Sequence, residues 1–161
     1  MGFPFTSLEQ DLRSEIRWLE DYGETPWKND SLKLLAAKKR EKLKNASSND
    51  LLRLIDYNDG YIKALAFESL CNRADNHLFD ALMSILEDTS SYIEAPFGHS
   101  TYPTAIGEYC VVNVLSMQIP SAPPPPSPKY DLDKLFSKKE LELIAAKYQE
   151  NKVKLIKPNF Y

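Results

Sequence analysis

The sequence has few cysteines and histidines and no long apolar run. Its two cysteines show no CxxC spacing, and with only two histidines they do not supply a structural zinc site. No apolar run approaches the roughly 20 residues that a helix needs to cross a bilayer. The first ten residues, MGFPFTSLEQ, lack the basic, apolar and small-residue segments of a secretion signal. We therefore expect a cytoplasmic protein without a metal site or a membrane segment.

An excess of basic charge is also lacking. The chain has 20 Lys and Arg against 23 Asp and Glu, so its net charge is −3 and gives no indication of a dedicated nucleic-acid binder. One basic cluster stands out and consists of Lys33, Lys38, Lys39, Arg40, Lys42 and Lys44. On a helix these residues would surround the axis, which favours a solvated face over a phosphate-binding stripe. Nucleic-acid binding is the weakest of the functions considered.

Catalytic signals are sparse. His99 stands beside Ser100 in a loop, but nucleophilic catalysis also needs a third group that orients the base, and an oxyanion site. No nucleophile elbow and no twelve-residue calcium loop is present. We expect no enzymatic activity and no cofactor.

Helix signals are frequent. Residues 1–47 contain two amphipathic patterns, predicted to form an N-terminal helical pair. Near the other end, Ser137 and Glu140 form a capping box before Leu141, Ile144 and Tyr148, which predicts a C-terminal helix within residues 130–161. Its apolar stripe should pack against the rest of the chain as a cap.

Residues 51–62 and 82–93 repeat one pattern. Aligning LLRLIDYNDGYI with LMSILEDTSSYI, at a shift of 31 residues, matches apolar with apolar positions and one polar turn with the other. Both segments then restart on the same Tyr-Ile pair. Helix–turn–helix units repeated at this spacing are typical of α-solenoids, in which Asp, Asn and Gly reverse the chain between two antiparallel helices.

The segment LLRLIDYNDGYIKALAFESL resembles a HEAT repeat, with a leucine-rich first helix, an acidic turn and a second helix that contains alanine. The resemblance covers residues 48–118, as two repeats. The second repeat departs from the pattern, because EAPFGHSTYP (94–103) contains Pro96, Gly98 and Pro103, which interrupt the helix expected there. We expect an irregular loop over 94–103 and a helix over 104–118, where the run VVNV would also suit a strand.

Residues 119–129 are rich in proline. The stretch PSAPPPPSP should adopt a polyproline II conformation, which predicts a semi-rigid spacer. Its PxxP spacing is also compatible with a ligand of SH3 or WW domains. The spacer is the favoured interpretation.

The repeat turns carry four carboxylates, those of Asp56, Asp59, Glu87 and Asp88. Stacked repeats place equivalent turns side by side, so these residues could form an acidic ridge that binds a basic protein. The alternative, which we favour, is that they cap helices and keep the turns soluble.

Aromatic residues gather near the same turns. Tyr57, Phe97 and Tyr102 are candidates for an interface, because tyrosine offers a large rigid area with a polar end. His99 lies in the same loop, and loops inserted into a repeat tend to lie on a binding face. We assign Tyr61 and Tyr92 to structural repeat positions.

Together these patterns predict one domain, residues 1–161, with an all-α fold. The expected architecture is a short HEAT-like α-α superhelix with an N-terminal helical pair and, after the Pro-rich segment, a C-terminal capping helix. The resemblance implies a non-catalytic protein-binding module, since small HEAT-like domains mainly bind proteins. Size and acidity are similar to those of bacterial immunity proteins that occlude a toxin. An adaptor or scaffold subunit is the alternative.

Overall fold

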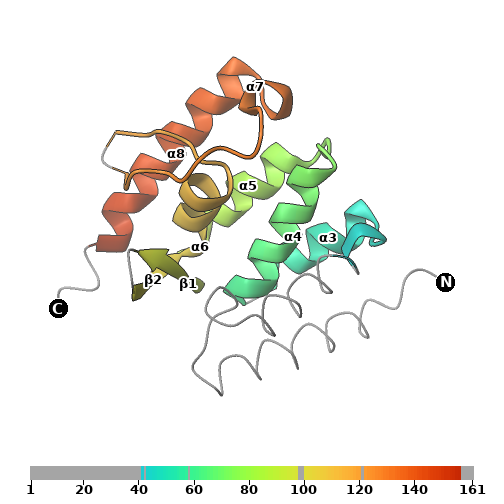
Figure 1. Ribbon diagram of the computed structural model, residues 1–161, viewed down its shortest axis with the longest axis horizontal. Helices are drawn as coiled ribbons and strands as arrows, with labels where there is room; N and C mark the ends of the chain where they lie inside the picture. The colour runs from blue at the N-terminus through green and yellow to red at the C-terminus, as the bar shows by residue number, and fades with distance from the viewer. Residues whose placement is uncertain (1–40, 42, 58, 98–99, 121, 157–161) are drawn as a thin grey trace.

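The computed structural model describes residues 41, 43–57, 59–97, 100–120 and 122–156, and this part of the chain is mostly helical (Figure 1). The predicted N-terminal helical pair lies outside the described residues, except for its end at residues 41 and 43–47. The elements are α3 (Ser48–Ile55), α4 (Gly60–Asn72), α5 (Leu78–Glu87), β1 (Tyr92–Phe97), β2 (Ser100–Ala105), α6 (Ile106–Glu108), the π-helix η1 (Tyr109–Val114), α7 (Leu132–Leu135) and α8 (Lys138–Ile156).

Side-chain caps fix where three of the helices begin. Ser47 accepts a hydrogen bond from the backbone N–H of Asp50 at the start of α3, at 3.1 Å. Asp59 accepts from the N–H groups of Tyr61 and Ile62, at 2.9 and 3.1 Å, at the start of α4. The predicted capping box of α8 is confirmed, because Ser137 and Glu140 exchange side chain to backbone hydrogen bonds of 3.1 and 2.8 Å.

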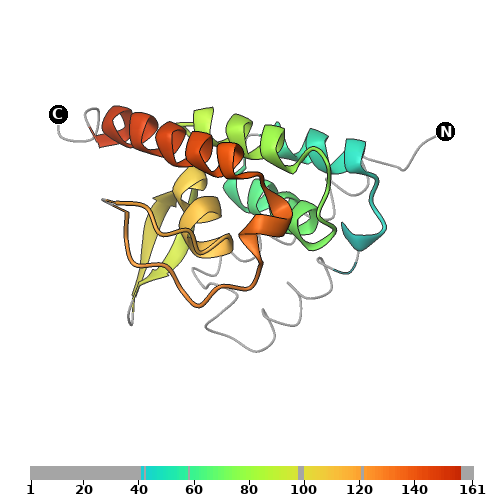
Figure 2. The same ribbon diagram turned by 90° about the horizontal axis from the view of Figure 1, so that it is seen from above.

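The helices form two layers, which Figure 2 shows edge-on. Helices α3, α5 and α8 form one layer, and α4 lies beside α6 and η1 in the other. Helix α4 packs against α3, α5, β1, α6 and η1, and most of its residues are therefore buried. Phe67 and Leu70 of α4 are fully buried in the single hydrophobic core. The core thus lies between the layers, and α4 is its central element.

The segment after α5 is where the irregular loop expected over residues 94–103 needs correction. Residues 92–97 and 100–105 form a two-stranded antiparallel sheet instead of an irregular loop, with Tyr92 opposite Ala105 and Phe97 opposite Ser100. Both strands lie at an edge, so Pro96 and Pro103 fit although neither can donate a hydrogen bond. The Tyr-Ile pair therefore restarts a helix in the first unit and a strand in the second. Lysine and alanines follow the first pair, whereas Glu94-Ala95-Pro96 follows the second.

The helix predicted over residues 104–118 is shorter than expected. It begins at Ile106, because β2 continues to Ala105, and from Tyr109 to Val114 it is a π-helix. The run VVNV is nevertheless helical, as predicted, and its valines are buried in the core. Ser116 follows with a positive φ of 54°, and the backbone N–H of Met117 bonds to the carbonyl of Val111. This turn ends the helical segment.

Helix α8 packs back onto the body, as predicted. Ile144 and Tyr148 of its apolar stripe are buried, and the stripe faces α5. The Tyr148 hydroxyl donates a 2.6 Å hydrogen bond to Glu108 of α6, and the buried Asn151 side chain donates to the carbonyl of Leu86 at the end of α5. The last helix is thus joined to both α5 and α6.

Candidate protein-binding surface

Two turns that lie 31 residues apart in the sequence meet at one edge of the two-layer body. We call the surface formed by residues 56–57, 59–60 and 88–92 the turn edge. Gly60, the first residue of α4, packs directly against the backbone of Tyr92. A Cβ atom at Gly60 would lie 2.8 Å from the carbonyl carbon of Tyr92 and closer still to its oxygen. Only glycine permits this approach, so the residue that opens α4 also fixes where the hairpin begins.

A buried ion pair joins the same two turns. The Nζ atom of Lys63 lies 2.6 Å from Oδ2 of Asp88, and the two side chains are 9% and 11% exposed. Oδ1 of Asp88 accepts hydrogen bonds from the backbone N–H groups of Ser90 and Ser91, at 2.9 and 3.1 Å, and from the Ser90 hydroxyl. Burial raises the pKa of the Asp88 carboxyl, but Lys63 and the serine donors lower it by more. The net result is a pKa well below the usual range, so Asp88 stays ionised.

The four predicted acidic residues take different roles at this edge. Asp59 caps α4, as the capping alternative expected, and Asp88 is held by Lys63. Asp56, at the end of α3, is exposed. Glu87 is also exposed, with its carboxylate 3.2 Å from Nζ of Lys147 on α8. Two carboxylates therefore face solvent near the turns, and two stabilise the fold.

The aromatic candidates also lie in different environments. Tyr57 is half-buried and packs against the core. Phe97 and Tyr102 lie on the two strands of the hairpin, and His99 lies outside the described residues. The hairpin that carries Phe97 and Tyr102 starts at the turn edge, so these two candidates follow directly from the predicted turns.

The sequence pattern placed Tyr92 at a structural position equivalent to that of Tyr61, and this prediction was wrong. Its side chain is 41% exposed, and within the described residues only Leu143 of α8, at 43%, is another large hydrophobic residue exposed to this degree. Tyr61, the equivalent residue of the first unit, packs against the core. The two tyrosines differ because Tyr61 continues into α4 whereas Tyr92 opens β1. The proline four residues after Tyr92 was the available signal for this difference.

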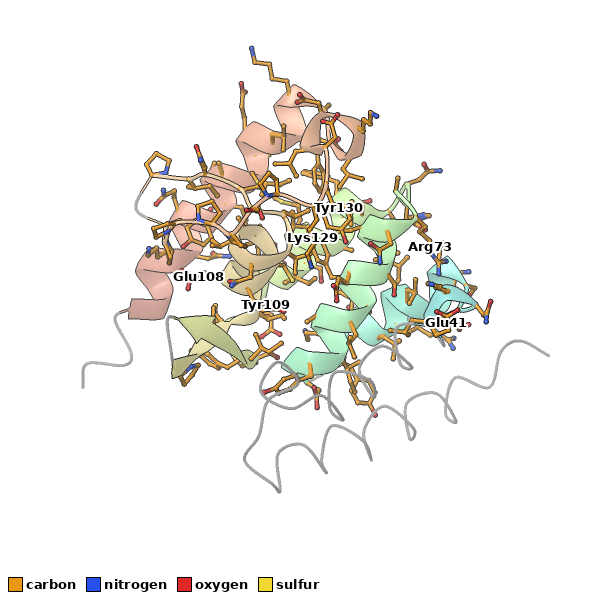
Figure 3. All side chains as sticks on the ribbon, viewed as in Figure 1. Glu41, Arg73, Glu108, Tyr109, Lys129 and Tyr130 are labelled. Atoms are coloured by element: carbon orange, nitrogen blue, oxygen red, sulfur yellow. The ribbon has the colours of Figure 1, made fainter. Side chains whose placement is uncertain are left out.

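The opposite end of α4 is occupied by contacts that hold the helices together. The Arg73 guanidinium donates to the carbonyls of Ala46, Leu43 and Lys44, at 2.8, 3.1 and 3.4 Å, and Figure 3 shows it reaching toward the segment around Glu41. Each carbonyl belongs to the end of the preceding helical segment, where a cation is favourable.

Asp75 accepts hydrogen bonds from Ser48 and His77 at this same end. Burial raises the pKa of the Asp75 carboxyl, but these donors lower it by more, so that the pKa lies below the usual range. Both Arg73 and Asp75 have their polar groups engaged within the fold. This end of the body therefore offers less for a partner than the turn edge.

The remaining pKa shifts among the described residues result from burial and hydrogen bonding within the fold. Burial raises the pKa of the Cys71 and Cys110 thiols, which are free and protonated and so are poor nucleophiles. Burial and the bond to Glu108 raise the pKa of the Tyr148 hydroxyl. The described part of the chain contains no group of three His, Cys, Asp or Glu side chains placed to hold a metal ion.

Most of the basic cluster predicted from the sequence lies outside the described residues. Lys33, Lys38, Lys39, Arg40 and Lys42 lie outside the described residues, whereas Lys44 is exposed and 2.9 Å from Glu41. Among the described helices, none combines the length and the apolar character required to cross a membrane.

Comparison with known proteins adds no further assignment. No family model matches the chain, and no curated protein or solved structure gives a significant match. The arrangement of side chains at the turn edge is therefore the basis for proposing a function.

Proposed function

We propose that this chain is a non-catalytic protein-binding module that engages its partner through the turn edge and the hairpin beside it. The observation that carries the proposal is the exposed Tyr92 side chain on a rigid support. Gly60 packs against its backbone, and the Lys63–Asp88 pair fixes the turn that precedes it. A rigid aromatic side chain loses little conformational entropy on binding, which is why tyrosine is common in binding hot spots.

The layered arrangement supports a HEAT-like architecture for this module. The pair of α3 and α4 is followed by α5 with α6 and η1, and α8 adds a further helix to the layer of α3 and α5. In such stacks, equivalent turns come together at one edge and extended surfaces become available to protein partners. The hairpin enlarges the turn of the second unit at that edge.

The exposed carboxylates favour a basic partner. Asp56 and Glu87 are exposed at the ends of α3 and α5, and the chain has an overall charge of −3. Opposite charge on the partner would raise the association rate and select against acidic surfaces. We further propose that the module acts as an immunity-type inhibitor, which covers the active site of a basic toxin with the hairpin.

Affinity capture from a lysate of the native cells, followed by mass spectrometry, tests the binding proposal. The wild-type chain should retain one partner in stoichiometric amount, and Tyr92→Ala should lose most of it. Leu143→Ala is the matched control, since Leu143 is equally exposed but lies on α8, and it should retain the partner. Equal retention by both variants would contradict the proposal.

The same captured partner tests the inhibitor proposal separately. A partner that carries a toxin domain, and whose activity falls to zero at one equivalent of the chain, supports immunity. A housekeeping complex with unchanged activity would overturn the inhibitor proposal and leave the binding module in place, as an adaptor.

A further inference from the structure

The Pro-rich segment between η1 and α7 lies against the body of the protein, with contacts at both ends. The Gln149 side chain of α8 donates a hydrogen bond to the carbonyl of Pro120. At the other end, the Tyr130 hydroxyl donates to the Asn72 side chain of α4, at 2.7 Å, and Ser116 reaches the carbonyl of Ser127 at 3.4 Å. Figure 3 shows Lys129 and Tyr130 over the middle of the molecule. These contacts restrict the conformational freedom of the segment, in addition to the restriction that its prolines impose.

Between these contacts the chain is extended. Residues 123–129 contain no turn and no bend, and prolines at five of these seven positions hold φ near the polyproline II value. This helix has three residues per turn, so it presents three edges, each formed by every third residue.

Burial follows that period over the first part of the segment, up to Pro126. Within the described residues of 122–129, the half-buried ones are Ala122 and Pro125, which lie three apart on one edge. Pro123 and Pro126 share a second edge and are both exposed. The third edge, with Pro124 and Ser127, is exposed as well. One edge thus contacts the body through Ala122 and Pro125, and Pro128, farther along that edge, is exposed. The other two edges face solvent, and Pro123 and Pro126 give one of them the PxxP spacing.

A segment that only connects η1 to α7 does not require an extended conformation with exposed prolines. Polyproline-binding domains contact two adjacent edges of their ligand in an aromatic-lined groove, and they benefit because the ligand is already extended. Here the edges that begin at Pro123 and Pro124 are both open to such a groove, and the half-buried residues lie on the third edge. Lys129, also exposed, follows Pro126 on the same edge and adds a positive charge.

We propose that residues 123–129 are a preorganised docking ligand for an SH3-type domain, whose aromatic groove is bordered by acidic residues. Pro123 and Pro126 enter the groove, and Lys129 meets the acidic border. The site is separate from the turn edge and does not depend on the function proposed for it. It would recruit a second protein while the turn edge holds the first.

Binding of the full chain to a panel of purified SH3 domains with acidic groove borders, measured by isothermal titration calorimetry, tests the proposal. At least one domain should bind, and the double variant Pro123→Ala/Pro126→Ala should weaken that binding by roughly tenfold or more, with a smaller loss for Lys129→Glu. Pro120→Ala is the matched control, because Pro120 is exposed but precedes the extended run, and it should bind like the wild type.

Thermal unfolding of each variant establishes that the fold is retained. The proposal is overturned if no domain binds the wild-type chain more tightly than about 1 mM. It is equally overturned if the double variant binds as well as the wild type, or if Pro120→Ala loses binding to the same extent. A WW domain that binds while every SH3 domain fails would also contradict the SH3-type assignment.

Discussion

Ala74 adopts a backbone conformation that alanine rarely takes. Its φ is 47°, in the left-handed region, and it follows Arg73, the C-cap residue of α4. The backbone N–H of Ala74 bonds to the carbonyl of Cys71, and that of Asp75 bonds to the carbonyl of Leu70, so the helix ends in a tight reversal. Glycine is the usual residue at such a position, because its backbone has no Cβ atom to clash.

We therefore predict that Ala74→Gly stabilises the protein. The gain should be about 0.5–1 kcal/mol, because the relief of left-handed strain exceeds the extra entropy of glycine in the unfolded chain. Urea unfolding measures this gain in the free energy of unfolding. Ala146→Gly is the control, since Ala146 is exposed within α8 and its replacement should cost about 1 kcal/mol. A loss of stability in Ala74→Gly would contradict the prediction.

At the scale of elements, the Lys63–Asp88 pair joins α4 to the turn between α5 and β1. The folded state lowers the pKa of Asp88, so the native protein binds fewer protons than the unfolded chain in mildly acidic solution. The pair therefore contributes its full stability above the ordinary aspartate pKa of about 3.9. That contribution is lost as the pH falls below it, toward the lowered pKa of the folded state.

Asp88→Asn should remove this dependence. At pH 7 the variant should be less stable by about 3 kcal/mol, because Lys63 remains buried without its partner. Its stability should then fall less steeply than that of the wild type between about pH 5 and 2. Urea unfolding across that range measures both effects. Asp56→Asn removes an exposed carboxylate and should follow the wild type, and an unchanged acid dependence in Asp88→Asn would rule out the role given to the pair.

The elements that the sequence predicted are those whose ends are set by local chemistry. Ser47, Asp59 and the Ser137–Glu140 box mark α3, α4 and α8 through hydrogen bonds that span three residues or fewer. The hairpin was missed because its first two residues, Tyr92 and Ile93, repeat a pair that starts a helix in the first unit. The two-residue Gly-His spacing between the strands was the local signal for it.

The π-helix and the partners of the site residues depend on long-range packing. A hydrogen-bond step of five residues in η1 is set by what packs around its valines, and no local motif in the sequence specifies it. The same holds for Asp88, whose partner Lys63 lies 25 positions earlier in the chain. Sequence reasoning placed the acidic turns together, but it did not show which carboxylates the fold itself would use.

At the scale of the whole molecule, the protein offers two separate surfaces. The turn edge lies where the two layers meet the hairpin, and the Pro-rich segment crosses the body between η1 and α7 (Figures 1 and 2). Helix α8 connects them, because its side chains bond both to Leu86 near the turn edge and to Pro120 at the start of the Pro-rich segment. This arrangement would allow one small protein to hold two partners at once.

The turn edge is the proposed binding surface, and photo-crosslinking in the native cells tests this proposal most directly. A photoreactive phenylalanine analogue would replace Tyr92 in one strain and Leu143 in another, because both side chains are exposed to the same degree. We expect irradiation to give one dominant covalent adduct with a single protein from position 92, and none from position 143. No adduct from position 92, or the same adduct from both positions, would contradict the claim that the turn edge is the binding surface.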